Sequence, residues 1–181
     1  MNYSLTLLTL LFLISCGTKK NHIDYEVETI DEDRVIFTEL NILEKIPYCG
    51  GARPTDDMLN RTKPVTAFFM LRGDNGFEKK VKSSEHGLIN LTLEAGTYHL
   101  KEISKDVPFL TFYLSQKAIK NSINDPNIKI GSEDCYAKWW KKNVIDFKIT
   151  DTTTVINETA YIFSNCYTSN PCDTYTGPIR P

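Results

Sequence analysis

The sequence has little excess charge of either sign and few histidines. Its 181 residues include 21 Lys and Arg against 23 Asp and Glu, a formal net charge of -2, and three His. No basic excess is available to hold a phosphate backbone, so we exclude nucleic acid as a partner. The histidines His22, His86 and His99 have no metal-ligand spacing with one another. We predict no metal site and no cofactor, and the alternative is a zinc site built from scattered residues.

Long apolar runs and internal repeats are also missing. Residues 5–14 form an apolar run of about ten residues, roughly half of what a helix needs to cross the hydrocarbon core of a membrane. A short run of this kind at the N-terminus, closed by a small residue, is typical of a secretory signal. No Lys or Arg precedes it, which departs from the usual pattern of such signals.

The end of this run, Leu13-Ile14-Ser15-Cys16, resembles the lipobox of bacterial lipoproteins. The resemblance implies that the Cys16 thiol carries a diacylglyceryl group and that Cys16 is the first residue of the mature chain. Several acyl chains give a lasting anchor. Gly17, rather than Asp, follows the cysteine, which implies the outer membrane of the cell envelope. The alternative is an ordinary signal peptide, or a buried N-terminal strand, with a chance cysteine.

Three segments follow from this reading. Residues 1–15 are the predicted lipoprotein signal peptide, residues 16–34 the lipidated N-terminus with a polar tether, and residues 35–181 one domain. A tether of this length reaches on the order of 25 Å. The remaining chain is long enough for one domain with a hydrophobic core and too short for us to expect two.

Strand signals dominate the domain, since aromatic residues make up 11% of the chain and Thr, Ile and Val are abundant. Alternation is clearest where Ile89, Leu91 and Leu93 are separated by polar residues, and Asn75-Gly76 is a hairpin signal. We predict strands that include residues 35–46, 65–71, 109–114 and 144–150. A short helix is predicted over residues 132–142 with Ser132 as its cap, and a helical turn after Thr55.

A glycine, an alternating strand and then L-x-x-G-x-Y are matched by Gly87, Leu93, Gly96 and Tyr98. This pattern is similar to transthyretin-like and carboxypeptidase-regulatory-like modules. With about eight short strands, it predicts a mostly β fold, an antiparallel β-sandwich (prealbumin-like) with one or two short helices. The resemblance implies a noncatalytic stalk, spacer or recognition domain, and it carries no catalytic residues.

Four cysteines remain in the domain: Cys49, Cys135, Cys166 and Cys172. An even number beyond the inner membrane predicts two disulfides, with three possible pairings. We favour Cys166 with Cys172, because the short loop between them contains turn residues, and the other pairings stay open. Cys49 beside a histidine base would be a candidate nucleophile. Because four paired cysteines leave no thiol free, we predict no enzyme, with an envelope enzyme or metal-binding protein using Cys49 or His residues as the alternative.

Two adjacent tryptophans distinguish the predicted helix. Neighbours on a helix point about 100° apart, so Cys135 and Trp139 share one face, and Tyr136 and Trp140 another. If the first pair is buried, an exposed binding platform for a sugar, a peptide or a partner protein would form from Tyr136, Trp140, Lys141 and Lys142. The alternative is that loops cover both faces.

The lipobox, the tether, the turn YCGG at residues 48–51 and the cysteine-bearing tail together resemble small uncharacterised lipoproteins of Bacteroidota. This adds no activity. The predicted function is a membrane-anchored envelope lipoprotein that serves as a noncatalytic binding, spacer or accessory module. Its partner would be an envelope protein or a glycan.

Overall fold

The computed structural model describes residues 35–179, and all that follows concerns this part of the chain. The predicted signal peptide, Cys16 and the tether lie outside the described residues. Within residues 35–179, no helix is both long enough and apolar enough to cross a membrane.

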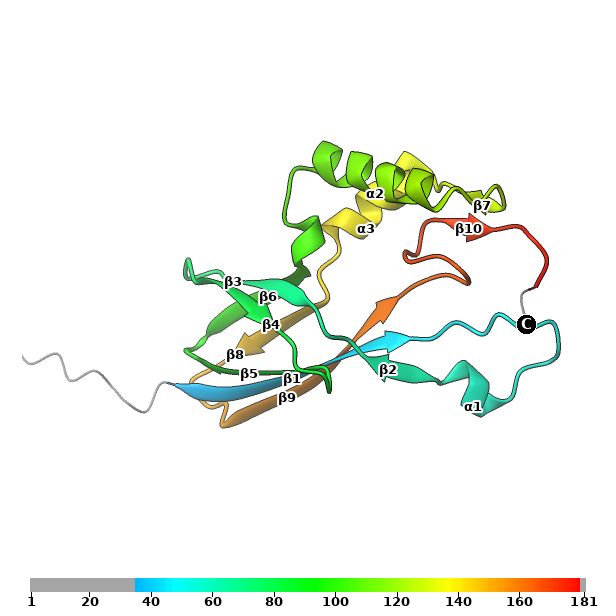
Figure 1. The fold of residues 1–181 in the computed structure, drawn as a ribbon. Coiled ribbons are helices and arrows are strands. Elements are labelled where there is room, and N and C mark those ends of the chain that lie inside the picture. Colours follow the sequence, from blue (N-terminus) through cyan, green and yellow to red (C-terminus); the bar gives the residue numbers. More distant parts are fainter. Residues whose placement is uncertain (1–34, 180–181) are drawn as a thin grey trace, which may run out of the picture. The chain divides into compact units, whose positions relative to one another are not determined.

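The described chain contains ten strands and three α-helices (Figure 1). The strands are β1 (Ile36–Lys45), β2 (Thr62–Pro64), β3 (Phe68–Gly73), β4 (Glu78–Lys82), β5 (Leu88–Leu93), β6 (Gly96–Glu102), β7 (Ile128–Lys129), β8 (Ile145–Ile149), β9 (Val155–Phe163) and β10 (Thr174–Tyr175). The helices are α1 (Asp56–Leu59), α2 (Phe109–Ile123) and α3 (Glu133–Lys141). The protein is therefore mostly β, as predicted.

One sheet, called the β1 sheet, is built around its longest strand. β9 pairs with β1 along nearly its whole length, from Phe37 opposite Val155 to Lys45 opposite Phe163, and this pairing is parallel. β5 and β2 pair with β1 antiparallel, one after the other along its second edge. The prediction of purely antiparallel pairing is therefore wrong for β9. The chain reaches β9 from the other sheet, so a hairpin does not set its direction.

The other sheet, called the β3 sheet, has the order β4-β3-β6-β8, and all its pairings are antiparallel. The predicted hairpin joins β3 to β4, and Gly76 in its turn has a φ of +83°. Residues with a Cβ rarely adopt this backbone conformation, which explains the Asn75-Gly76 signal. β7 and β10 form a separate two-stranded ladder.

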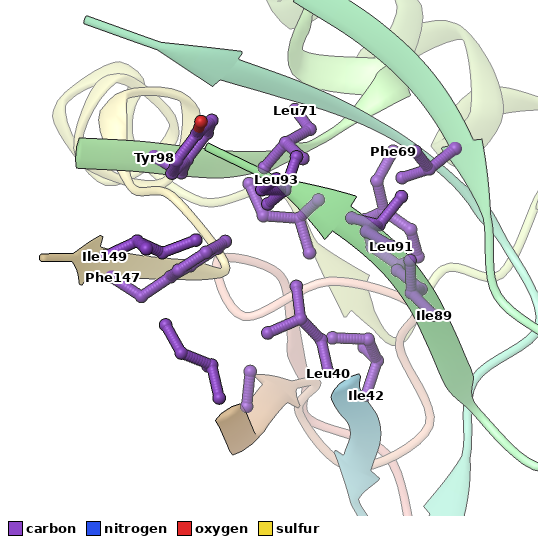
Figure 2. Close-up of a cluster of buried hydrophobic side chains, with 14 residues drawn as sticks. Leu40, Ile42, Phe69, Leu71, Ile89, Leu91, Leu93, Tyr98, Phe147 and Ile149 are labelled. Atoms are coloured by element: carbon purple, nitrogen blue, oxygen red, sulfur yellow. The ribbon is translucent and has the colours of Figure 1, made fainter. Parts of the chain in front are cut away.

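The two sheets share one hydrophobic core of fourteen buried residues (Figure 2). The β1 sheet contributes Leu40, Ile42, Ile89, Leu91, Leu93, Ile156 and Ala160. The β3 sheet contributes Phe69, Leu71, Val81, Tyr98, Leu100, Phe147 and Ile149. These residues alternate with outward-facing ones along their strands, because successive side chains of a strand point to opposite faces. The sequence alternation at Ile89, Leu91 and Leu93 predicted this correctly.

The chain passes from the β1 sheet to the β3 sheet between β5 and β6. Directly after this crossing, Tyr98 is 1% exposed and its hydroxyl donates a hydrogen bond to the main-chain oxygen of Glu94, 2.9 Å away. The ring stacks on Phe147 of β8, with 5.5 Å between ring centroids. The tyrosine singled out in the sequence therefore fixes the corner at which the chain changes sheet.

The segment of residues 109–114 was predicted as a strand, and this prediction is wrong. These residues form the first part of α2, which is fifteen residues long. The aromatic content of FLTFYL favours a strand, but Phe109, Phe112 and Tyr113 recur at helical spacing. All three belong to a second hydrophobic cluster, separate from the core of the sheets. This cluster also contains the buried Tyr136 and Cys172. Tertiary packing against α3 has overridden the local preference.

Candidate functional site

Helix α3 begins and ends where its sequence predicts. The Ser132 hydroxyl accepts a hydrogen bond from the main-chain N–H of Cys135, which caps the first turn. Glu133 and Asp134 lie in that first turn and Lys138 and Lys141 in the last. This placement of charge is favourable for the helix dipole. The helix carries both tryptophans into the second hydrophobic cluster.

Tyr136 is not exposed, so the predicted platform is wrong for this residue. Its side chain has no exposed area, and its hydroxyl donates a 2.6 Å hydrogen bond to Asp173. Burial raises the pKa of the Tyr136 hydroxyl well above its ordinary value, and the bond to Asp173 acts in the same direction. The ring packs against Phe112 and Tyr113 of α2. The platform hypothesis left this face open because residues 109–114 were predicted to be a strand, so no helix was expected beside α3.

The two tryptophans are both partly buried and have different surroundings. Trp140 donates its indole N–H to the main-chain oxygen of Val107, 2.9 Å away, and the Lys101 ammonium lies 4.5 Å from the centre of its ring. Trp139 packs edge-on against Phe112, with 5.1 Å between centroids. The remaining surface of Trp139 lines a cavity. The tryptophan that borders this cavity is therefore the one that the platform hypothesis had placed on the buried face.

This cavity, which we call the α3–β9 pocket, has a volume of about 300 Å³. It lies between α3, the end of β9 and the segment of residues 171–172. Its apolar walls are Trp139, Tyr161, Phe163 and the disulfide of Cys135. Tyr161 and Phe163 are 41% and 50% exposed, so their rings remain available for contact. An apolar body of small-molecule size fits such a pocket.

Three lysines also line the pocket. Lys138 and Lys142 are exposed, and the Lys142 ammonium lies 5.5 Å from the centre of the Phe163 ring. Glu102 is the one carboxylate among the lining residues, and it lies 2.9 Å from the ammonium of Lys105. The exposed positive charge at the pocket favours an anionic ligand. Of the predicted platform residues, Lys142 therefore lines the pocket, whereas Lys141 does not.

Lys105 is a buried cation, with 2% of its surface exposed. Its ammonium donates to the main-chain oxygens of Trp139 and Lys142, at 3.3 and 2.8 Å, in addition to its contact with Glu102. A cation at the C-terminal end of a helix satisfies main-chain oxygens that have no helical partner. Lys105 therefore holds the floor of the pocket in place and is not a free charge for a ligand.

The disulfides join Cys49 to Cys166 and Cys135 to Cys172. The favoured pairing of Cys166 with Cys172 is therefore wrong. Cys49 and Cys166 follow β1 and β9, whose parallel pairing brings their ends together. The other bridge fastens α3 to residue 172 and forms part of the pocket wall. Cys49 borders a second cavity of about 290 Å³, but it carries no free thiol to act as a nucleophile.

The segment behind the pocket is held by a buried carboxylate. Asp173 is 3% exposed and accepts hydrogen bonds from the Tyr136 hydroxyl, the Gly131 main-chain N–H and the Asn170 side-chain amide. The Asn170 oxygen in turn accepts from the main-chain N–H groups of Cys172 and Asp173. These bonds fix Cys172 and thereby the pocket wall.

Neither histidine within residues 35–179 lines this pocket. His99 on β6 bonds Asp146 through Nδ1 at 2.7 Å and Asp74 through Nε2 at 3.3 Å. The bond to Asp146 raises the pKa of His99 above its ordinary value. His86 is exposed beside Glu85, and His22 lies outside the described residues. Between residues 35 and 179, no three His, Cys, Asp or Glu side chains come together as metal ligands.

Comparison with known proteins adds little. No family model matches the chain, and no curated protein matches it. A solved structure that it resembles is that of the Bacillus anthracis TIE protein, at 18% sequence identity and a TM-score of 0.33. The similarity covers 71% of this chain and 17% of that one. A likeness this distant carries no argument about function.

Sequence reasoning missed Tyr161, Phe163 and Lys105. The aromatic pair at i and i+2 near the end of a strand was visible, since both side chains must lie on one face of β9. Nothing in the sequence placed that face beside α3. Lys105 gave no signal, because one lysine in a charged stretch does not differ from a surface lysine.

Proposed function

We propose that this protein is an envelope lipoprotein whose domain binds a small apolar acid in the α3–β9 pocket and acts as a binding module without catalysis. The observation that carries the proposal is the composition of the pocket. Aromatic walls, a fixed disulfide and the exposed Lys138 and Lys142 occur together in a cavity of about 300 Å³. Ligand sites of proteins are typically apolar hollows of this size with a few polar groups.

The location in the cell envelope is supported by two features. The lipobox-like residues before Cys16 favour a lipid anchor, with Gly17 favouring the outer membrane. Two disulfides in the described domain fit a compartment in which disulfides persist. Both features support the proposal that the protein folds beyond the inner membrane.

We also propose that the two sheets form a β-sandwich of the prealbumin-like kind. The shared core supports this, because side chains of both sheets fill it. The corner made by Tyr98 at the change of sheet also supports it. The parallel β9 is a departure from the antiparallel pattern.

The register of β1 indicates where the pocket lies relative to Val35, the first described residue. The described chain begins at Val35, next to the start of β1, and β1 then extends for ten residues, or about 30 Å. Tyr161 and Phe163 pair with residues 43 and 45 at the far end of this strand. The pocket therefore lies at the opposite end of β1 from Val35.

The test uses the full chain in nonionic detergent with 4-phenylbutyrate as the probe and 4-phenylbutanol as its uncharged counterpart. We expect saturable binding of the acid, followed by tryptophan fluorescence, and binding of the alcohol at least tenfold weaker. Lys142→Gln should weaken binding of the acid by about fivefold and Trp139→Ala by at least tenfold.

Lys141→Gln is the matched control, because it removes the same charge one residue away and outside the pocket. It should bind the acid within twofold of the unaltered protein. Equal binding of acid and alcohol, or equal effects of the two lysine changes, would contradict the proposal.

A further inference from the structure

A second surface lies on the outer side of the β3 sheet. Along β4, Val81 points into the core, so its neighbours Lys80 and Lys82 point outward and are exposed. Along β3, Phe69 and Leu71 are buried, so Phe68 and Met70 point outward in the same way. Lysine and apolar side chains therefore alternate across this outer face.

The strand register places these side chains next to one another. Met70 lies between Lys80 of β4 and Lys101 of β6, and Phe68 pairs with Lys82. The ammonium groups of Lys80 and Lys82 lie 4.5 and 5.4 Å from the centre of the Phe68 ring. We call this surface the lysine–aromatic face, and it consists of Phe68, Met70, Lys80, Lys82, Lys101 and Trp140.

Trp140 completes the face at its β6 side. The Lys101 ammonium lies 4.5 Å from the centre of its ring. Trp140, Lys101 and Arg72 border a broad, shallow depression of about 370 Å³. Phe68 is 44% exposed, and Met70 is partly exposed. A flat ligand can therefore contact an aromatic ring at either side of the face.

Negative charge on this face is already in use. Arg72 is paired with both Glu78 and Asp106, and His99 with both Asp146 and Asp74. Among the described residues, by contrast, Lys80, Lys82 and Lys101 form no salt bridge with a carboxylate. Burial lowers the pKa of Lys101, and the positive charge of Lys105 acts in the same direction. The exposed Lys80 and Lys82 therefore carry most of the positive charge that no carboxylate on this face pairs, in a chain whose net charge is -2.

The spacing of the three lysines limits the kind of anion that fits. Lys80 and Lys82 are two residues apart on one strand, which separates their backbones by roughly 7 Å. Lys80 and Lys101 lie on strands on either side of β3, which separates them by about 10 Å. The ammonium groups of Lys80 and Lys82 lie over one ring and can share an anionic group, whereas Lys101 on the far side of β3 can bind a second one. The ligand that fits carries repeated negative charges and has apolar surfaces between them.

We propose that the lysine–aromatic face binds an acidic polysaccharide. Carboxylates on successive sugar units bind Lys80, Lys82 and Lys101, and the C–H face of a sugar ring packs on the exposed Phe68. Uronic acid chains have this combination of a carboxylate on each unit and an apolar ring face. The binding is electrostatic in large part, so it weakens as salt screens the charges.

The test uses the full chain in nonionic detergent, in native gel electrophoresis with and without polygalacturonate in the gel. Neutral dextran is the control polymer. We expect polygalacturonate to slow the protein and dextran to leave it unchanged. The variant K80Q/K82Q/K101Q should bind polygalacturonate at least tenfold more weakly, and Phe68→Ala at least threefold more weakly.

The matched control is K79Q/K117Q/K129Q, which removes three positive charges outside the face. Lys79 lies on β4 next to Lys80, but it is on the side of the strand that also carries Val81. This variant should bind polygalacturonate within twofold of the unaltered protein. Lys142→Gln should do so too, and this result would distinguish binding at the lysine–aromatic face from binding at the α3–β9 pocket. Melting curves of each variant should match that of the unaltered protein, which checks that the variants are folded.

Two outcomes overturn the proposal. Equal losses in the two triple variants would mean that polygalacturonate detects net charge only. Binding to phosphatidylglycerol vesicles or to a DNA oligonucleotide, without binding to polygalacturonate, would assign the face to a membrane or to nucleic acid.

Discussion

The buried ammonium of Lys105 donates a hydrogen bond to the main-chain oxygen of Lys142, 2.8 Å away, immediately after the last residue of α3. The same ammonium bonds Trp139 and Glu102. One side chain therefore joins the end of α3 to the 3-10 turn Ile103–Lys105 that follows β6.

Replacement of Lys105 by Met tests this role. The variant removes the ammonium group that bonds the Glu102 carboxylate and two main-chain oxygens, and these acceptors lose that partner. We therefore expect the free energy of unfolding to fall by about 3 kcal/mol. Urea denaturation measures the change. Lys138→Met, at an exposed position of α3, should alter stability by less than about 0.5 kcal/mol. Similar small effects of both changes would show that Lys105 is not needed to end the helix.

The disulfide pairing predicts which peptides remain linked. Proteolysis without reduction, followed by mass spectrometry, should recover Cys49 linked to Cys166 and Cys135 linked to Cys172, with no free thiol among the four. From loop length alone, the bridges contribute about 5 and about 4 kcal/mol. Cys135→Ser/Cys172→Ser should also weaken 4-phenylbutyrate binding, because this bridge is a wall of the pocket. A linked Cys166–Cys172 peptide would refute the arrangement.

His99 predicts a dependence of stability on pH. Its hydrogen bond to Asp146 raises its pKa in the folded protein above the ordinary 6.5. The folded state therefore binds a proton more tightly than the unfolded state. This stabilisation is complete below about pH 6.5 and is lost as the pH rises through the higher folded pKa. Chemical denaturation between pH 5 and 9 should show this fall, and His99→Gln should remove it.

Lipidation of Cys16 is testable in bacterial cells that process lipoproteins. We expect labelled palmitate to be incorporated into the protein, and mass spectrometry to find an acylated N-terminal peptide that begins at Cys16. Cys16→Ala should abolish the label and release the protein from the membrane fraction. Label retained in Cys16→Ala, or an unaltered chain that begins at Met1, would contradict the anchor.

Local features of the fold could be predicted from the sequence. Alternation gave the strands around Ile89 and Tyr98, the Asn75-Gly76 pair gave a hairpin, and Ser132 gave the start of α3. Each of these depends on residues close together in the chain. The same is true of the short helix after Thr55, whose side chain accepts a hydrogen bond from Met58.

Features that depend on distant residues could not be predicted. The first residues of α2, 109–114, favour a strand locally, and their packing against α3 accompanies the helix that they form instead. The disulfide pairing follows from the parallel contact of β1 with β9, which brings Lys45 opposite Phe163 and thus Cys49 towards Cys166. The pocket was missed for the same reason, since its aromatic walls come from β9 and α3.

The pairing of β1 on both edges has a mechanical consequence for any load applied at Val35. Tension that enters at Val35 acts along β1, in line with the strand direction. The hydrogen bonds from β1 to β9 and β5 then bear the load all at once. In a hairpin that is pulled open from its end, by contrast, the hydrogen bonds break one after another. A load applied between Val35 and the far end of β9 must therefore break the hydrogen bonds on both edges of β1 together.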